Sequence, residues 1–217
     1  VYGGGCGTDK YWADRTKETN KGDGDTYNPL AGIVYGNTTI TMDGGTVVHN
    51  IYGAGAMGSV GQTTKDTDNH LVISDGGATT IAISGGTVGV SGTVDDGNVF
   101  GAARGDETTT QAGIALVKET SVTISQADGK TTMIYGNVYG GGETGDVGTY
   151  TNTYTTTGSK NYVWDKIDNK EIGGCSVSVT GGQVKGNVFG AGKGVDNSFE
   201  CEKAIVRTAT VSVSADL

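Results

Sequence analysis

The chain has 217 residues and a net charge of −9, and 40 of its residues are glycine against a single proline. The length allows one large domain or two small ones, and the lack of a Gly-X-Y period and of proline enrichment excludes collagen. The acidic balance excludes a basic nucleic-acid footprint, and no apolar run approaches the roughly 20 residues of a membrane helix, so we expect neither nucleic-acid binding nor membrane insertion.

A phrase built from an aromatic residue and glycines recurs from the first residues onwards. It reads VYGGG at 1–5, NIYGAG at 50–55, GNVFGAA at 97–103, GNVYGGG at 136–142 and GNVFGAG at 186–192. Such recurrence indicates a repeat architecture in which like residues stack. We therefore expect two structural ladders: an aromatic column of Tyr2, Tyr52, Phe100, Tyr139 and Phe189, and a hydrogen-bonded asparagine column of Asn50, Asn98, Asn137 and Asn187.

Alternating segments accompany the phrases along the chain: TITM at 39–42, TIAI at 80–83, SVTI at 121–124, SVSV at 176–179 and TVSV at 210–213. Period-two alternation predicts half-buried strands, with Ile, Val and Met on the inner face and mostly Thr and Ser on the outer one. Glycine pairs follow three of these segments and predict turns, because glycine tolerates positive φ at little cost.

A third element, a short apolar run, comes before each alternating segment, at 33–35, 71–73, 114–117, 162–164 and 204–206. Each repeat would then hold three short strands. The segments of variable length all follow the phrase, at about 6–32, 56–70, 104–113, 143–161 and 193–203. Length variation confined to one of three connections is typical of stacked repeats.

The predicted fold is all-β: a right-handed single-stranded parallel β-helix (β-solenoid) with about three short strands per coil, four to five coils, and loops inserted at one corner. Residues 1–217 would form a single β-helix segment, and the pattern at both ends favours a fragment of a longer repeat protein. A β-sandwich also uses short strands, but it leaves the regular recurrence of the phrase unexplained.

Motifs with catalytic or metal-binding chemistry are weak. The glycine phrase lacks the helix that follows a dinucleotide or phosphate loop. Asp23-Gly24-Asp25 is like the start of a calcium loop, but Tyr27 stands at its fifth position and no Glu closes it, so no cofactor or metal site is expected and calcium stays open. Three cysteines leave at least one thiol unpaired, with a Cys175–Cys201 bridge possible and Cys6 as the third.

Carboxylates and histidines are scattered through the chain, and we interpret them as solvated loop residues with no catalytic assignment. They include His49, His70, Asp95, Asp96, Arg104 with Asp106 and Glu107, and Glu143 with Asp146.

The order of alternating strand, Gly-Gly and Asn-Val-Tyr/Phe-Gly-Gly/Ala-Gly resembles the glycine-rich repeats of large bacterial cell-surface proteins, of the β-helical adhesin and autotransporter-passenger kind. The resemblance is one of repeat style and covers most of the chain outside the loops. It implies an extracellular or cell-surface protein with a repetitive parent, and it carries no catalytic residue across.

The function expected first is that of a structural or adhesive rod that holds variable loops away from a bacterial surface, without enzymatic activity. Loop aromatics supply large amphipathic contact areas, so the binding candidates are Tyr11, Trp12, Tyr27, Tyr150 and Tyr154, unless these rings only pack over the coil. The partners would be other repeats of the same protein, end-to-end copies, glycans, or host and bacterial surface molecules.

Three alternatives stay open. Unpaired strand edges at both ends would make the chain a self-assembling fibre subunit. Because β-helix folds include polysaccharide lyases and hydrolases, a polysaccharide-binding or polysaccharide-cleaving enzyme is the second alternative. Outward Thr and Ser rows on a flat face leave ice binding as a remote third.

Overall fold

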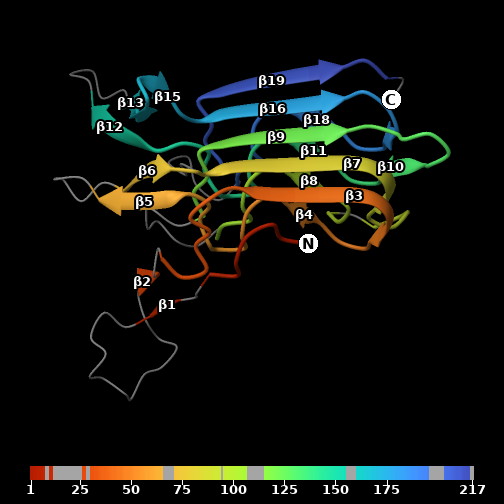
Figure 1. Ribbon diagram of the computed structural model, residues 1–217, viewed down its shortest axis with the longest axis horizontal. Helices are drawn as coiled ribbons and strands as arrows, with labels where there is room; N and C mark the ends of the chain where they lie inside the picture. Colours follow the sequence, from red (N-terminus) through yellow and green to blue (C-terminus); the bar gives the residue numbers. More distant parts are fainter. Residues whose placement is uncertain are drawn as a thin grey trace.

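The structure is a computed structural model that describes residues 1–7, 10–11, 26–27, 30–65, 71–93, 95–106, 115–154, 160–195 and 203–215. The regular secondary structure of these residues is β-strand, without a helix. Two parallel sheets form the body of the molecule, and short antiparallel pairs project from it (Figure 1).

The larger parallel sheet has seven strands and carries the alternating segments. Its order is β17-β10-β7-β9-β16-β19, and β3 pairs with β7 from outside this path. The first half of β7 pairs with β9 and its second half with β10, so this long strand serves two neighbours. The strands are β3 (Thr38–Val47), β7 (Ala78–Val88), β9 (Glu119–Ile124), β10 (Thr132–Ile134), β16 (Gly174–Val179), β17 (Gln183–Val184) and β19 (Thr208–Val213).

The smaller parallel sheet carries the aromatic-glycine phrases and is curled like half of a barrel. Its order is β18-β11-β8-β4, and Tyr2 extends it through a bridge to Tyr52. Its strands are β4 (Ile51–Tyr52), β8 (Val99–Phe100), β11 (Val138–Tyr139) and β18 (Val188–Phe189).

The core lies between the two parallel sheets, because alternation sends the apolar residues of both inward. Ile81 and Ile83 of β7 and Val99 of β8 are fully buried in one cluster, and Val122 and Val177 extend it along the larger sheet. Burying each such side chain stabilises the fold by about 1.5–3 kcal/mol before the entropy of ordering is subtracted. One sheet alone has no partner for these side chains, so the two sheets stabilise each other.

A column of buried threonines, which was not expected from the sequence, links the two parallel sheets. Thr38, Thr79 and Thr120 occupy equivalent, register-matched positions of β3, β7 and β9. Their hydroxyls donate to the carbonyl oxygens of three phrase glycines in the smaller sheet, at 2.6, 2.5 and 2.5 Å, and the acceptors are Gly53, Gly101 and Gly140. A buried hydroxyl satisfied in this way adds a directional contact to the apolar core.

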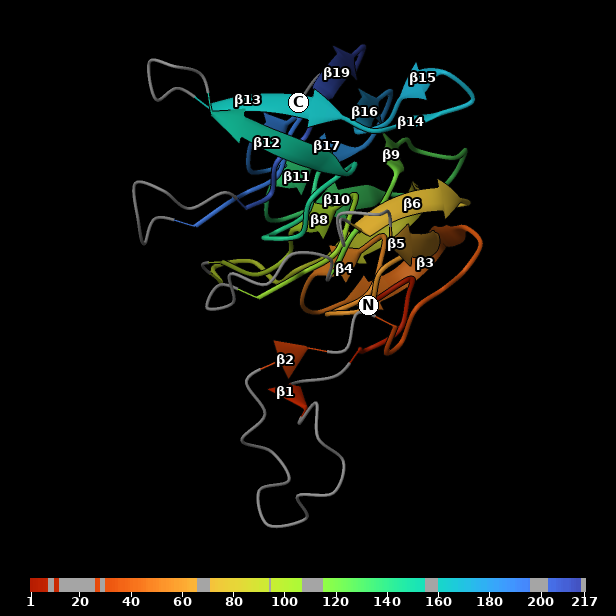
Figure 2. The same cartoon turned by 90° about the vertical axis from the view of Figure 1, so that its left-hand side faces the viewer.

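Four antiparallel pairs lie on one side of the parallel sheets, at the left of Figure 1, and Figure 2 views them from that side. They are β1 (Lys10–Tyr11) with β2 (Thr26–Tyr27), β5 (Gln62–Lys65) with β6 (Leu71–Asp75), β12 (Tyr150–Tyr154) with β13 (Lys160–Trp164), and β14 (Lys166–Ile167) with β15 (Lys170–Glu171).

The expected right-handed β-helix with three strands per coil is wrong. The strands fall into separate and mostly short sheets, and the smaller parallel sheet is a curled half-barrel. Where a third strand column was expected, the described residues form only isolated parallel bridges, which join Val34 to Val60, Val117 to Val147 and Val147 to Val206. Single bridges on that side do not make a continuous third sheet.

The reason lies in the apolar runs that were taken as third strands. Runs 71–73 and 162–164 belong to β6 and β13, which pair antiparallel with β5 and β12. The bridging residues of those two repeats are instead Val60 and Val147. In the repeats of Val60 and Val147 the insertion follows the bridging valine, whereas in the other repeats the variable segment precedes it. The expectation of one common insertion corner is therefore also wrong.

Candidate functional site

The aromatic residues of the phrases stack as one column through the smaller parallel sheet. Ring centroids of successive members are 4.8–4.9 Å apart, with interplanar angles of 5–14°. The three middle rings are buried, with Phe100 at 0 % exposure. Tyr2 and Phe189 close the column at its two ends and are 41 % and 43 % exposed. The buried middle of the column is a packing device, and only its two end faces are open to a partner.

The glycine after each aromatic residue leaves no space for a side chain. A Cβ on Gly53 would overlap the carbonyl oxygen of Gly101, and a Cβ on Gly101 would overlap that of Gly140. The same crowding holds at Gly3 and at Gly140. Successive repeats approach closely at these glycines, and this crowding explains why the phrase recurs. The cause is structural, and a phosphate-binding loop is not needed to explain it.

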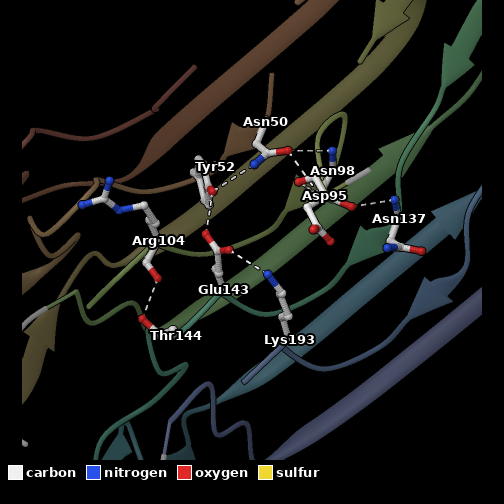
Figure 3. A network of polar contacts seen from close by, with 9 residues as sticks. All are labelled: Asn50, Tyr52, Asp95, Asn98, Arg104, Asn137, Glu143, Thr144 and Lys193. Carbon is white, nitrogen blue, oxygen red and sulfur yellow. Dashed lines mark hydrogen bonds and ion pairs between the residues drawn. The ribbon is translucent and has the colours of Figure 1, made fainter. Parts of the chain in front are cut away.

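The asparagines of the phrases form a hydrogen-bonded ladder, of which Figure 3 shows Asn50, Asn98 and Asn137. The side-chain Oδ1 of Asn50 accepts from the backbone N–H of Asn98 at 2.8 Å, and the same bond joins Asn98 to Asn137 and Asn137 to Asn187. Two weaker amide-to-amide contacts accompany it, from Asn98 Nδ2 to Asn50 at 3.3 Å and from Asn187 Nδ2 to Asn137 at 3.4 Å. Asn50, Asn98 and Asn137 thus each satisfy a backbone donor of the next repeat.

The carboxylate of Glu143 contacts side chains of two other repeats. Tyr52 donates its hydroxyl to Glu143 Oε2 at 2.6 Å, and Lys193 Nζ lies 3.0 Å from Oε1 (Figure 3). Asn50 Nδ2 in turn donates to the Tyr52 hydroxyl at 3.3 Å. The side chain therefore bridges three repeats, from the phrase of Tyr52 to the segment after β18.

The titration behaviour of this network follows from burial and from the Glu143 charge. Burial raises the pKa of the Tyr52 phenol, and the hydrogen bond to Glu143 raises it further. Burial likewise raises the pKa of Tyr139. At Lys193, partial burial opposes the charged form, but the hydrogen bond and charge of Glu143 outweigh it and the pKa is raised. Tyr52, Tyr139 and Lys193 therefore stay protonated near neutral pH.

Asp95 lies beside this network, close enough for its charge to act on Tyr139 and Lys193 (Figure 3). Asp96 Oδ2 lies 3.1 Å from His49 Nδ1 on the surface, where the histidine side chain is 75 % exposed. Asp95 has a φ of 68° and its carbonyl accepts from Asn98 Nδ2 at 2.9 Å. No group of three His, Cys, Asp or Glu that could hold a metal ion occurs among the described residues.

Of the five loop aromatics named as binding candidates, only Tyr150 has a described side chain. Its ring contacts Tyr162 edge-on, with centroids 5.1 Å apart, and Trp164 at a tilt, with centroids 4.9 Å apart. Tyr11, Tyr27 and Tyr154 lie in strands β1, β2 and β12, and only the backbone of these three residues is described. Trp12 lies outside the described residues. His70, Cys201 and residues 23–25 also lie outside them.

Tyr162 and Trp164 join the cluster, although they were assigned to a core strand from the sequence. Trp164 is the register partner of Tyr150, and Tyr162 lies two residues before Trp164 on the same face of β13, a spacing that signals a one-sided aromatic hairpin. The exposed Val163 between them points to the other face, with an exposure of 50 %. A tight stem anchors this hairpin: a Cβ on either Gly148 or Gly173 would lie 2.9 Å from the Trp164 ring.

The thiols have separate environments. Cys6 is exposed and free, and Cys175 is buried and free, so the possible bridge from Cys175 is not formed. Burial raises the pKa of Cys175 to about 11, against a smaller effect of its hydrogen bond with Thr120. A buried thiol with a raised pKa is unreactive as a nucleophile.

Comparisons with family models, with curated proteins and with solved structures found no match to this chain. Among the described residues there is no helix long and apolar enough to cross a membrane. The functional interpretation therefore depends on the geometry of the chain itself.

Proposed function

We propose that the chain is a structural, loop-presenting segment of an extracellular surface protein, and that its aromatic hairpin makes adhesive contacts. The observation that carries this proposal is the segregation of the antiparallel pairs to one side of the parallel sheets (Figure 2). A rigid stacked body with projecting hairpins separates stability from recognition, as binding loops on other scaffolds do.

The hairpin β12/β13 is the contact element that this proposal favours. It gathers Tyr150, Tyr162 and Trp164 on one face, and aromatic side chains offer large contact areas at low entropic cost. Sugar rings and the surfaces of other proteins both bind to such aromatic faces. The resemblance to glycine-rich bacterial surface repeats supports the same assignment and a location outside the cell.

The neighbouring repeat shows how hairpin β12/β13 can be deleted without interrupting the parallel sheets. Deleting residues 148–172 joins Val147 to Gly173, as Val117 is joined directly to Lys118 in the neighbouring repeat. Val147 bridges Val117, and the Gly173 amide donates to the Lys118 carbonyl at 2.9 Å, so the deletion restores an existing connection. The shortened chain should keep the parallel sheets.

The matched control removes the other long hairpin. Deleting residues 61–76 joins Val60 to Gly77 in the same way, and the removed segment contains no aromatic residue. Binding to an array of bacterial and mammalian polysaccharides and to whole bacterial cells is measured for all three chains. We expect the deletion of 148–172 to abolish binding and the deletion of 61–76 to leave it.

Equal binding by all three chains would contradict the proposal. Release of shortened polysaccharide by the full chain would replace it with an enzymatic function.

A further inference from the structure

The aromatic face of hairpin β12/β13 has a composition that restricts the class of ligand it can bind. Tyr150, Tyr162 and Trp164 are all partly exposed, so each residue is covered on one part and open to a partner on another. An assignment of the ligand rests on the proposed function, in which this projecting hairpin makes the contacts (Figure 2).

The three rings are held in place by the protein itself. A Cβ on either of the two stem glycines would lie 2.9 Å from Cζ3 of Trp164, so the indole rests directly on the stem. The Tyr150 ring is inclined at 59° to Trp164, and its hydroxyl donates to Asp146 Oδ2 at 3.4 Å. Tyr162 packs edge-on against Tyr150 at 73°. Side chains that are already fixed lose little entropy when a ligand binds.

The hairpin is nearly uncharged, although the chain as a whole carries a net charge of −9. Residues 147–164 contain no aspartate or glutamate, and their only charged residue is Lys160, at the opposite end of β13 from Trp164. A positively charged ligand would find no carboxylate on β12 or β13, and the acidic remainder of the chain would repel a polyanion. The charge distribution therefore favours a neutral ligand.

Hairpin β5/β6 shows that this composition is not a general property of the projecting pairs. Residues 62–75 contain three aspartates, a lysine and a histidine, and they contain no Phe, Tyr or Trp. Aromatic rings and a lack of carboxylates thus occur together in one long hairpin and are both missing from the other.

We propose that the aromatic face of hairpin β12/β13 binds a neutral polysaccharide. The C–H groups of a sugar ring are apolar and pack against aromatic rings, while its hydroxyls pair with uncharged groups such as the threonines and asparagines of residues 149–161. Tyr162 and Trp164 are two residues apart on one face of β13, so a linear sugar chain can contact both rings in succession.

A folded protein partner fits this face less well. Stable protein interfaces bury about 800 Å² on each side, and one aromatic side chain supplies about 150–250 Å² when it is fully covered. Three rings that the protein already covers in part offer less than such an interface needs. A sugar chain is narrow enough to be held by the rings alone.

The test measures binding by the fluorescence of the hairpin. The chain has two tryptophans, so Trp12→Phe in the full chain leaves Trp164 as the only one. The neutral probes are soluble dextran, β-glucan, mannan and galactan, with alginate as the anionic probe and chitosan as the cationic one. We expect a neutral probe to change the Trp164 emission with saturation, and alginate and chitosan to leave it unchanged. Added NaCl should not weaken binding, because no ion pair holds the ligand.

Three variants in this background assign the effect to the aromatic face. Tyr162→Ala removes one ring without altering the stem and should weaken binding about tenfold. Tyr162→Phe keeps the ring and should retain binding. Val163→Ala is the matched control on the opposite face, where Val163 is 50 % exposed, and should change nothing. Circular dichroism checks that each variant keeps the fold.

The outcomes separate this ligand from the proposed function. Cell binding that requires residues 148–172, without binding of any neutral probe, would overturn the neutral ligand and leave the proposed function standing. Binding that does not depend on these residues would contradict both. A preference for alginate or chitosan, or an unchanged affinity in Tyr162→Ala, would rule out a neutral sugar chain on this face.

Discussion

Strand β16 and hairpin β12/β13 belong to the same repeat, but they are held in different ways. β16 pairs over all six residues with β9 on one side and with β19 on the other, and its inner face is buried. The two strands of the hairpin pair with each other over five residue pairs, and the Trp164 ring lies against the stem glycines Gly148 and Gly173. β16 therefore depends on repeats that are distant in the sequence, whereas hairpin β12/β13 is held by contacts between residues close in the sequence.

This difference indicates which of the two elements tolerates substitutions. A strand of the parallel sheets shares its core and its backbone donors with two other repeats, so a defect there spreads through the stack. A hairpin on a two-glycine stem can vary without disturbing its neighbours. We therefore assign stability to the parallel sheets and variability to the hairpins, and three substitutions test this division.

The largest effect is expected for Val177→Asp in β16. The side chain is 1 % exposed and lies in register between Val122 and Val211, so an unpaired carboxylate would be buried there. We expect a loss of about 4 kcal/mol or more in the free energy of unfolding, measured by urea denaturation.

Two controls accompany this substitution. Ser178→Asp places the same charge on the outer face of β16, and Val163→Asp places it on an exposed position of the hairpin. Both should change stability by no more than about 0.5 kcal/mol. Similar losses for Val177→Asp and Ser178→Asp would mean that the two faces of the strand are assigned wrongly.

The next effect is expected for Gly101→Ala, which tests the close approach of successive repeats. A Cβ at this position would overlap the carbonyl oxygen of Gly140, and backbone cannot move aside as a side chain can. We expect a loss of about 3 kcal/mol by the same denaturation measurement.

Gly36→Ala is the matched control, since no atom lies within 4 Å of a Cβ built there and its φ is not positive. It should be neutral or stabilising by a few tenths of a kcal/mol, because alanine reduces the entropy of the unfolded chain. If both substitutions cost the same, crowding is not the reason that the phrase contains glycine.

The parts of the molecule that repetition determines could be predicted. The aromatic residues from Tyr2 to Phe189 share one phrase, and stacking in register follows from the repetition alone. The alternation of β7 and β16 likewise assigned Ile81 and Val177 to the inner face, where both are buried.

The parts that depend on partners outside the phrase could not be predicted. Runs 71–73 and 162–164 have the apolar composition of a core strand. They lie in hairpins instead, because they pair antiparallel with β5 and β12, and the composition of the runs does not reveal these partners. Glu143 has no sequence motif, because its contacts with Tyr52 and Lys193 bring together residues far apart in the chain. A signal for the bridging valines did exist: Val60 and Val147 both come eight residues after the aromatic residue of their phrase.

The smallest expected effect concerns Cys175, which occupies the column of buried threonines. Cys175 pairs in register with Thr120, whose hydroxyl donates to the Gly140 carbonyl at 2.5 Å. The acceptor that a threonine at position 175 would meet is Gly190, the equivalent glycine of the next phrase. Cys175→Thr should therefore add a hydrogen bond and stabilise the chain by about 1 kcal/mol, measured by urea denaturation in the presence of reductant.

Cys175→Val controls for shape, since valine has the branching of threonine without its hydroxyl. It should gain nothing, and the difference between the two variants isolates the hydrogen bond. A stabilisation shared by both would assign the effect to packing in the column and not to the link between the two parallel sheets. A loss with Cys175→Thr would show that the threonine rule of β3, β7 and β9 does not extend to β16, so that the body of the molecule tolerates variation that we assign to the hairpins alone.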